Sequence, residues 1–341
     1  MKAIVLEKPG QLSLIDVDAP AAPGSDEVLV RVKRVGICGT DLHAFGGNQN
    51  FFTYPRIMGH ELAVEVVAIG PTDISHDYAV GDTCCVIPYL HCGECIACRR
   101  GKTNCCTNMQ VLGVHVDGGM REQFIVPVDK LIKADGIPVE HLALVEMLCI
   151  GAHAVNRARL QSRETVLVIG AGPIGLATAA FAKAAQADVI MMEINDKRLA
   201  FCKEALGIEK TIQPGDDTVP ELQKLANGDL PTTVFDCTGN ANSMQAAFDY
   251  VAHGGSLVLV GHIKGDITFS DPHFHSHEMT LIASRNATRA DFEWVINTLR
   301  AGQINLTHWI THTATPEEVV EVFPSWRDPA TGVVKAMLTF D

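Results

Sequence analysis

The stretch Thr165-Val-Leu-Val-Ile-Gly170-Ala-Gly-Pro-Ile-Gly175 decides the fold of the second half of the chain. Its first five residues form a continuous apolar run, which is typical of a strand buried on both faces of a parallel sheet. Its glycines follow the pattern G-x-G-x-x-G, which permits a tight turn, lets a pyrophosphate approach the backbone and allows close helix–strand packing. The helix N-terminus that follows supplies free N–H groups for phosphates. The stretch therefore predicts a dinucleotide site that includes Gly170, Gly172, Pro173, Ile174 and Gly175.

The sequence on either side of this turn alternates between strand and helix. We expect further strands at 188–193, 233–236 and 256–260, and helices through residue 187 and at 197–206 and 243–251. This alternation predicts an α/β fold with a doubly wound parallel sheet.

Glu193 ends the second of these strands, 18 residues after Gly175, which is close to the spacing of a carboxylate that accepts adenosine ribose hydroxyls. Its charge would repel a 2′-phosphate and so favours NAD over NADP, although Arg198 is near enough in sequence to leave NADP open. Thr238 and Val260, near the ends of the next two strands, are further expected cofactor contacts.

The first 150 residues are rich in β-structure. Strands are expected at 27–33, 63–69 and 83–87, with frequent Gly, Pro and Asn between them and no long amphipathic helix before about residue 139. A helix at 291–300 and a strand at 334–340 follow the parallel sheet. The length of 341 residues suggests about two domains.

The composition excludes several classes of function. Hydrophobic residues make up 47% and charged residues 20%, which is typical of a folded globular protein. The 27 basic and 40 acidic residues give a net charge of −13, which argues against nucleic acid and anionic membranes as partners. The longest apolar run, 166–182, contains three glycines and a proline and is better explained as strand, turn and helix than as a membrane span.

Cysteine is unevenly distributed. Seven of the eleven cysteines lie between Cys84 and Cys106, and the N-terminus has no signal-peptide pattern. We therefore expect a reducing, cytoplasmic compartment, where clustered cysteines indicate metal rather than disulfides.

One cluster is Cys92-Gly-Glu-Cys95-Ile-Ala-Cys98, followed by adjacent cysteines at 105 and 106. Four thiolates suit a closed tetrahedral zinc site with a structural role. The residues alone leave the fourth position open between Cys105 and Cys106.

A second set of metal-ligand types is dispersed along the chain. It comprises Cys38-Gly-Thr-Asp-Leu-His43, then Gly59-His60-Glu61, then Glu146. A catalytic zinc takes about three protein ligands and keeps one position for substrate or water, and Cys, His and carboxylate side chains meet that need.

The order of these motifs resembles that of the zinc-dependent medium-chain alcohol/polyol dehydrogenase family over essentially the whole chain. The resemblance implies a GroES-like catalytic domain at 1–150 and 291–341, a Rossmann domain at 151–290, and a homodimer or homotetramer. It also implies that the structural zinc uses the cysteine eight residues after the third, so its ligands would be Cys92, Cys95, Cys98 and Cys106.

By the same resemblance, the catalytic zinc would be held by Cys38, His60 and Glu61, with Glu146 near the metal as a ligand or through water. The polyol branch of the family usually has Glu-Pro where this chain has Glu146-Met147, so the loop here departs from the pattern.

The resemblance also implies a mechanism. Zinc acts as a Lewis acid on the substrate hydroxyl, and hydride passes to the nicotinamide. Thr40 would take the proton and pass it through the nicotinamide ribose to His43 as the terminal base, while Asp41 would orient the ring of His60.

Within the family, the chain is most similar to hexonate dehydrogenases of the L-galactonate type, which oxidise a C5 hydroxyl. The similarity lies in the segments 45–49, 51–56, 113–119, 269–272 and 284–288. The expected substrate contacts are Asn48, Phe51, His115, Arg285 and Asn286, and among them Arg285 would bind the carboxylate of a sugar acid.

Other functions remain open on the sequence. L-threonine 3-dehydrogenase shares the Cys-Gly-Thr-Asp-x-His segment closely, and a neutral polyol dehydrogenase would suit the acidic chain. A zinc-free quinone reductase is disfavoured by both zinc patterns. A different class is an NAD-binding redox sensor, which the intact Thr40 and His43 argue against. The alternating His273, His275 and His277 are expected on a solvated strand edge or loop rather than around a metal.

Overall fold

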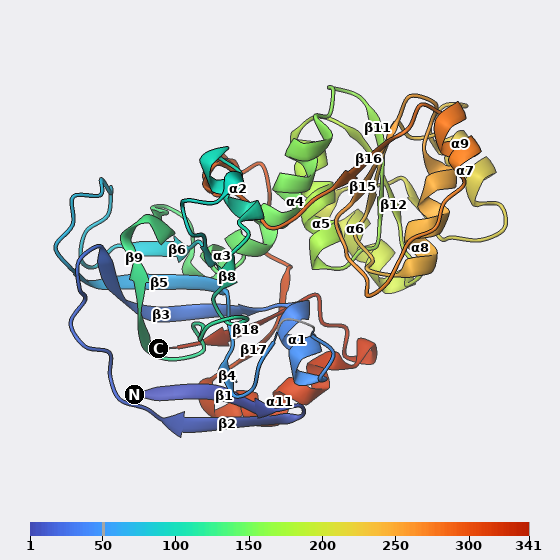
Figure 1. Ribbon diagram of the computed structural model, residues 1–341. Helices are drawn as coiled ribbons and strands as arrows, with labels where there is room; N and C mark the ends of the chain where they lie inside the picture. Colours follow the sequence, from blue (N-terminus) through green and yellow to red (C-terminus); the bar gives the residue numbers. More distant parts are fainter. Residues whose placement is uncertain (50–51, 341) are drawn as a thin grey trace. The chain divides into compact units, whose positions relative to one another are not determined.

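The computed structural model describes residues 1–49 and 52–340, and the chain separates into two compact units. Unit 1 comprises Met1–Glu146, Thr288–Arg300 and Leu306–Asp341, and unit 2 comprises Met147–Ala287 and Ala301–Asn305. The end of the chain therefore returns to the unit in which it began (Figure 1).

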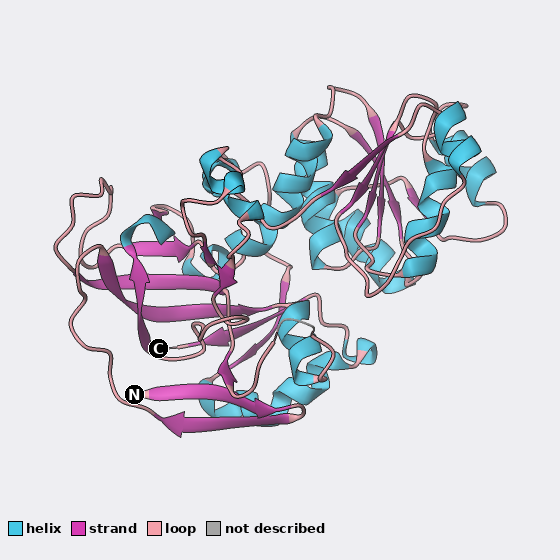
Figure 2. Ribbon diagram, viewed as in Figure 1, coloured by secondary structure: helices cyan, strands magenta, loops and turns pink. Residues whose placement is uncertain are grey.

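Unit 2 is built on a six-stranded, wholly parallel sheet with helices on both of its faces (Figure 2). Its order is β13-β12-β11-β14-β15-β16, the arrangement of a doubly wound dinucleotide-binding fold, as predicted. The strands are β11 (Thr165–Ile169), β12 (Asp188–Met192), β13 (Thr211–Ile212), β14 (Thr233–Asp236), β15 (Ser256–Leu259) and β16 (Thr280–Ala283). The helices are α5 (Pro173–Ala184), α6 (Asp196–Leu206), α7 (Thr218–Leu225), α8 (Ala241–Ala246) and α9 (Asp271–Ser276).

The glycine turn between β11 and α5 admits no side chain at its crowded positions. Gly170 has a φ of 93°, in the left-handed region that favours glycine. A Cβ atom on Gly175 would lie 1.7 Å from the carbonyl oxygen of Gly170. Gly172 is the N-cap of α5, and Pro173 occupies its first turn.

Unit 1 contains a seven-stranded sheet with the order β10-β6-β5-β3-β18-β17, in which β9 also pairs with β3, and a three-stranded sheet with the order β2-β1-β4. The last strand, β18, pairs antiparallel with β3, so the C-terminal segment completes the N-terminal sheet. The strands are β1 (Lys2–Lys8), β2 (Gln11–Asp16), β3 (Glu27–Ile37), β4 (Arg56–Ile57), β5 (Glu61–Ile69), β6 (Thr83–Val86), β7 (Tyr89–Leu90), β8 (Gln110–Val111), β9 (Gln123–Pro127), β10 (Leu131–Lys133), β17 (Ile310–Ala314) and β18 (Lys335–Thr339).

A short helix that the sequence reading did not anticipate begins where β3 ends. The Asp41 carboxylate accepts a hydrogen bond of 2.9 Å from the backbone N–H of Cys38, which stabilises the first turn of α1 (Gly39–Phe45). The other helices of this part of the chain are α2 (Ile96–Arg99), α3 (Val139–Leu142), α10 (Arg289–Arg300) and α11 (Pro316–Val322), and α4 (Val145–Ala158) runs from the end of unit 1 into unit 2.

The predicted strands at 165–169 and 233–236 are confirmed to the residue, whereas the predicted helix at 243–251 is shorter than expected. It begins earlier, as α8, because Asn240 caps it, and it tightens into a 3₁₀ turn over Ala247–Tyr250. Among the described residues, no helix has the length and apolar character needed to cross a membrane.

Candidate metal centres and cofactor site

The first candidate metal centre is the four-cysteine loop. The sulfur atoms of Cys92, Cys95, Cys98 and Cys106 all lie within 4.8 Å of one another, and Cys95–Cys98 and Cys92–Cys106 are each separated by 3.5 Å. Zn–S bonds of about 2.3 Å in a tetrahedron place sulfurs roughly 3.8 Å apart, so the set fits zinc. Cys105 is exposed and lies outside the group.

Backbone donors prepare these sulfurs to bind a cation. The N–H groups of Cys92 and Asn108 each donate to the sulfur of Cys106 over 3.3 Å. Backbone N–H donors from Cys98 and Thr107 lower the pKa of Cys95 to about 5, which favours the thiolate, the form that binds metal.

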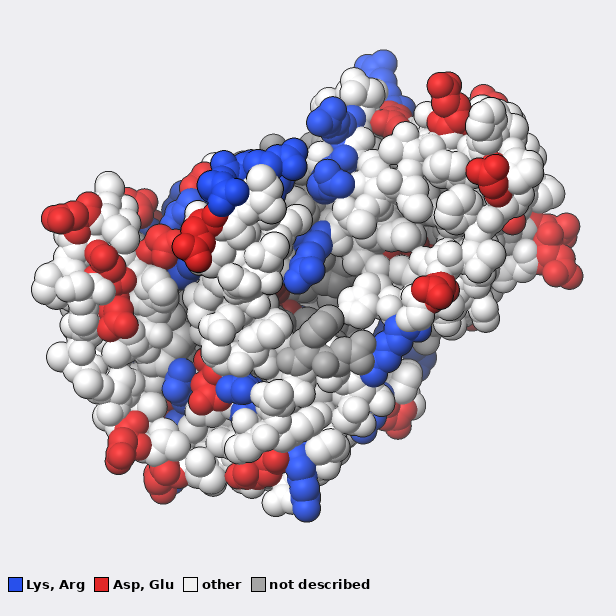
Figure 3. Space-filling model, in the orientation of Figure 1, with Lys and Arg blue, Asp and Glu red and all other residues white. Residues whose placement is uncertain are grey.

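A cluster of basic side chains surrounds the same loop. Figure 3 shows Lys and Arg gathered over α2, where Arg99, Arg100 and Lys102 are exposed. Four thiolates and one Zn²⁺ would carry a net charge of about −2, which these cations offset.

The second candidate metal centre lies where β3 and β5 pair. Gly36 of β3 is opposite Glu61 of β5, which brings Cys38, just beyond β3, close to His60 and Glu61. Ligand atoms of these three side chains lie within 4.8 Å of one another, and His60 and Glu61 are buried. The arrangement offers three protein ligands, the number typical of a catalytic zinc.

The electrostatics of this group call for a cation. Burial disfavours the charged form of His60, but the negative charges of Asp41 and Cys38 outweigh burial and hold its pKa well above the usual value. Among the described residues, the buried atoms His60 Nδ1 and Asp41 Oδ1 have no hydrogen-bond partner. Thiolate, imidazole and carboxylate donors around such unsatisfied atoms fit a divalent zinc ion.

Asp41 lies beside His60 without a direct hydrogen bond to it. Its Oδ1 is 3.8 Å from His60 Nδ1, while its Oδ2 accepts the N–H of Cys38. Burial raises the pKa of Asp41.

Lys335 is a partner of this centre that sequence reasoning missed. Its Nζ, on β18, lies 2.6 Å from Oε1 and 2.5 Å from Oε2 of Glu61, and both side chains are buried. Burial opposes the charge of Lys335, but Glu61 and Cys38 outweigh it and raise its pKa. The sequence carries one sign of a buried lysine here, because Lys335 interrupts the otherwise apolar run Val333-Val-Lys-Ala-Met-Leu338.

Glu146 stands in the first turn of α4, near the second centre but outside the group of three. It is buried, and one of its oxygens accepts a hydrogen bond from the hydroxyl of Tyr89. Burial, with a contribution from Glu61, raises the pKa of Glu146, while His60 and Tyr89 oppose that rise.

The two residues expected in a proton relay share α1. Thr40 is half-buried and His43 is exposed, three residues further along the helix. Residues at this spacing lie on one face of a helix.

The candidate cofactor site is a cavity of about 520 Å³ in unit 2, at the carboxyl ends of β11 and β14. Of the predicted contacts, Gly170, Gly172, Glu193, Arg198 and Thr238 line it, whereas Pro173, Ile174, Gly175 and Val260 do not. The sequence reading missed Pro214, Asn240, Asn242, Ser243 and Tyr250, which also line it. Asn240 could have been predicted, because a helix N-cap residue that follows a parallel strand lies at the carboxyl edge of the sheet, where the cofactor binds.

Glu193 is fixed before any ligand arrives. It accepts hydrogen bonds from the backbone N–H groups of Ala171 (2.8 Å), Ile194 (2.8 Å) and Asn195 (3.1 Å), and Arg198 Nη1 lies 3.8 Å away. Three N–H donors fix the carboxylate in the lining of the cavity.

The expected substrate residues are divided between the units. Asn48 is exposed and His115 is half-buried in unit 1, where His115 Nδ1 accepts the N–H of Val111 over 3.1 Å. Arg285 and Asn286 follow β16 in unit 2. Phe51 lies outside the described residues.

The expectation of a strand edge or loop for the alternating histidines is wrong. His273 and His275 lie in α9 and His277 is its C-cap, because Ser270 caps a helix with proline in its first turn. The rings of His273 and His277 lie 4.0 Å apart, and His277 stacks on His253 at 3.8 Å.

Known proteins match this architecture over its whole length. The family described as zinc-binding dehydrogenase matches residues 173–301, and the alcohol dehydrogenase GroES-like domain matches residues 24–137. L-galactonate-5-dehydrogenase of Escherichia coli K12 is 40% identical over 100% of this chain and 99% of its own. The chain belongs to the zinc-binding medium-chain dehydrogenases.

Two further relatives show the breadth of this dehydrogenase family. L-threonine 3-dehydrogenase of Pyrococcus horikoshii is 34% identical over 99% of both chains. The rspB alcohol dehydrogenase of Escherichia coli CFT073, solved with NADH, is 31% identical with a TM-score of 0.92, over 100% of this chain and 99% of that one.

The first prediction concerns metal content. Purified dehydrogenase should hold two zinc ions per chain by elemental analysis. Cys106→Ser should lower the content to one, because it removes a ligand of the four-cysteine centre. The neighbouring Cys105→Ser should leave it at two; an equal loss in both variants would contradict the assignment of the fourth ligand.

The second prediction separates the roles of two glycines. Gly175→Ala should destabilise the dehydrogenase by at least about 2 kcal/mol, because its methyl group meets the Gly170 carbonyl. Gly172→Ala should retain normal stability, since nothing lies within 4 Å of its Cβ position, but should weaken NADH binding by blocking the pyrophosphate. Denaturant unfolding and NADH titration check both. Unchanged stability of Gly175→Ala would refute the packing argument.

The third prediction concerns the buried ion pair. Lys335→Met should cost about 3–5 kcal/mol in unfolding free energy, because it leaves the Glu61 carboxylate buried without its cation. Lys133→Met, which removes a more exposed lysine bridging Asp82 and Asp135, should leave the unfolding free energy almost unchanged, because solvent screens the exposed pair. Equal losses of unfolding free energy in the two variants, measured by urea denaturation, would show that the buried ion pair stabilises the fold no more than the exposed one.

Proposed function

We propose that this dehydrogenase oxidises a secondary hydroxyl of a sugar acid, an L-galactonate-like hexonate at C5, and transfers the hydride to NAD. The observation that carries the chemistry is the group formed by half-buried Cys38 and buried His60 and Glu61, which offers three ligands to a catalytic zinc. The full-length identity of 40% to L-galactonate-5-dehydrogenase supports the substrate class.

The residues of the chain have separate roles in this reaction. Zinc, when bound, supplies the Lewis acidity that lowers the pKa of the substrate hydroxyl. Thr40 would accept the hydroxyl proton at its Oγ1 as it gives up its own proton toward His43, and His43, which is exposed, would release a proton to solvent. Cys38, His60 and Glu61 bind the metal, and Glu146 lies beside them.

NAD is the proposed cofactor because of Glu193. Its carboxylate accepts three backbone hydrogen bonds and lines the cofactor cavity, where it would accept ribose hydroxyls and repel a 2′-phosphate. Arg198, the nearest cation, is directed toward Glu193 itself at 3.8 Å.

Substrate selection is assigned to a few polar residues. Arg285, exposed after β16, would bind the carboxylate of the hexonate as a two-pronged donor. Asn48, His115 and Asn286 would bind its hydroxyls. Phe51, the remaining expected contact, lies outside the described residues. The chain's eleven free cysteines suit a reducing cytoplasm, and we expect a homodimer or homotetramer.

L-threonine oxidation is the second candidate, and the identity of 34% to a threonine dehydrogenase favours it. A neutral polyol is a further alternative, because it would not have to approach against a net charge of −13. An NAD-binding redox sensor without turnover is the remaining alternative.

The fourth prediction tests the proposal with a panel of hexonates, threonine and neutral polyols, using NAD reduction as the readout. L-galactonate-like hexonates should give the highest kcat/KM, and chelation should abolish activity that added zinc restores. Arg285→Met should raise KM for hexonates about tenfold or more and leave KM for polyols unchanged, because only the carboxylate loses its partner.

The exposed Arg163 precedes β11 in the same unit and provides the control, so Arg163→Met should leave both KM values unchanged. Preference for threonine would overturn the substrate class. Absence of turnover with the whole panel would favour the sensor.

A further inference from the structure

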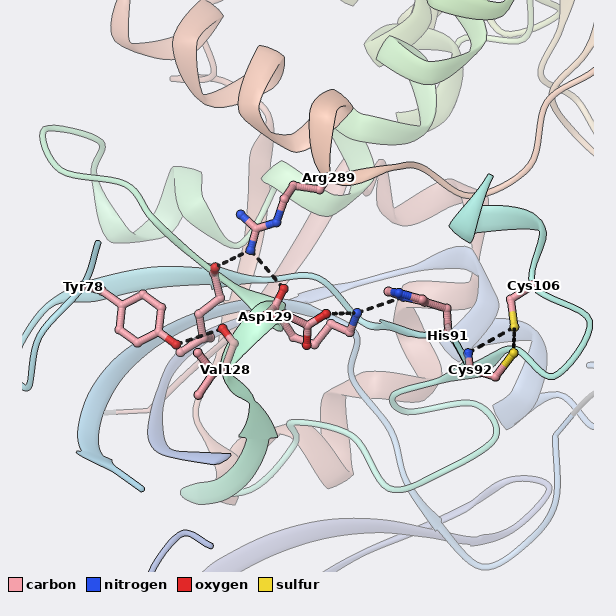
Figure 4. A network of polar contacts seen from close by, with 9 residues as sticks. Tyr78, His91, Cys92, Cys106, Val128, Asp129 and Arg289 are labelled. Carbon is pink, nitrogen blue, oxygen red and sulfur yellow. Dashed lines mark hydrogen bonds and ion pairs between the residues drawn. The ribbon is translucent and has the colours of Figure 1, made fainter. Parts of the chain in front are cut away.

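The short strand β7 lies directly before the four-cysteine loop. Tyr89 in this strand and His91 just after it contact two different parts of unit 1. The hydroxyl of Tyr89 donates to an oxygen of Glu146. Two residues later, His91 Nδ1 lies 3.0 Å from Nζ of Lys130, a buried lysine that also pairs with Asp129 at 2.7 Å. Cys92, the first ligand of the loop, comes next, and Figure 4 shows it beside His91.

The same strand forms the base of the four-cysteine loop. Tyr89 pairs with Val111 and Leu90 with Gln110 in the β7–β8 ladder, so the chain between them is a closed loop. Cys92 and Cys106 lie inside this loop, and their sulfurs are 3.5 Å apart. A metal bound by the loop therefore also fixes the strand pair from which Tyr89 projects.

Tyr89 is held in one place by its surroundings. Its side chain is buried, and its ring contacts the edge of Phe292 at a centroid distance of 6.3 Å. A tyrosine hydroxyl has one proton to donate, and Tyr89 donates it to Glu146.

Glu146 depends on this contact. The hydroxyl of Tyr89 donates a hydrogen bond to one oxygen of the buried Glu146 carboxylate. A carboxylate so deeply buried needs a donor to fix its orientation. The charges of His60 and Glu61 act on Glu146, so it lies within electrostatic range of the second centre.

We propose that Tyr89 is a positioning residue that fixes Glu146 beside the Cys38–His60–Glu61 group, and that it makes the catalytic metal site dependent on the four-cysteine loop. The inference rests on the proposed function for its catalytic metal, and it adds a structural reason for the closed metal loop: the loop orients a carboxylate of the other centre.

The experiment compares Tyr89→Phe with Tyr78→Phe in the full-length protein, with cobalt(II) in place of the catalytic zinc. Tyr78 is the matched control, because its hydroxyl is also buried in unit 1 but donates to the carbonyl of Val128 over 2.8 Å (Figure 4). The readouts are the visible absorption of the cobalt site and the rate of cobalt loss to a chelator. Neither requires a substrate, so a wrong substrate class would leave this test intact.

Tyr89→Phe should change the cobalt spectrum and speed metal loss by about 10–100-fold, the range found when a residue supporting a metal site is removed. Tyr78→Phe should behave as the unsubstituted protein in both readouts. With the preferred substrate, Tyr89→Phe should lower kcat more than it raises KM, because Glu146 lies near the metal rather than at the substrate's distal end.

A double variant tests whether Tyr89 acts through Glu146. If it does, Tyr89→Phe with Glu146→Gln should lose cobalt no faster than Glu146→Gln alone. If the two substitutions instead multiply each other's effect on the rate of cobalt loss, Tyr89 acts elsewhere, and the proposal is overturned. A cobalt spectrum and release rate of Tyr89→Phe equal to those of Tyr78→Phe would also overturn it.

Discussion

Buried negative charge is the constraint on which the rest of unit 1 depends. Asp41, Glu61 and Glu146 are buried in this unit, and an unpaired buried carboxylate is costly. Each finds a partner from a different element: a backbone N–H for Asp41, Lys335 for Glu61 and Tyr89 for Glu146. The sheet order serves this need, because the pairing of β18 with β3 brings the C-terminal lysine to a carboxylate 274 residues away. The negative charges of Asp41 and Cys38 still raise the pKa of His60, and a zinc ion bound here would offset them.

The other two functional centres of the chain follow the same principle with backbone donors. Glu193 accepts hydrogen bonds from three backbone N–H groups at the edge of the parallel sheet, and the loop cysteines accept N–H bonds within their own turns. In each case backbone N–H groups hold the acceptor side chain in place before the ligand binds. This preparation reduces the reorganisation needed on binding, which is how a folded scaffold gains affinity for metal or cofactor.

Features encoded over short distances could be predicted from the sequence. The glycine turn, the strand before it and the four-cysteine loop each lie within about 20 residues, so their geometry follows from local spacing. Contacts between distant segments could not be predicted: Tyr89 is 57 residues from Glu146, and nothing in the local pattern joins them. The prediction for the histidines of α9 was wrong because their alternation suggested a strand. The segment forms a helix because Ser270 caps it and Pro272 lies in its first turn. The side chains lining the cofactor cavity from α8 also depended on which strands become neighbours.

The central claim is that one chain forms two distinct metal centres. One has four cysteine ligands, and the other, at Cys38 and His60, keeps a coordination position for substrate or water. Anomalous X-ray scattering recorded above and below the zinc edge tests this claim most directly. The account predicts two zinc peaks per chain, one among Cys92, Cys95, Cys98 and Cys106 and one within bonding distance of Cys38 and His60. Crystals of active enzyme with a single peak, at the four-cysteine loop alone, would contradict it.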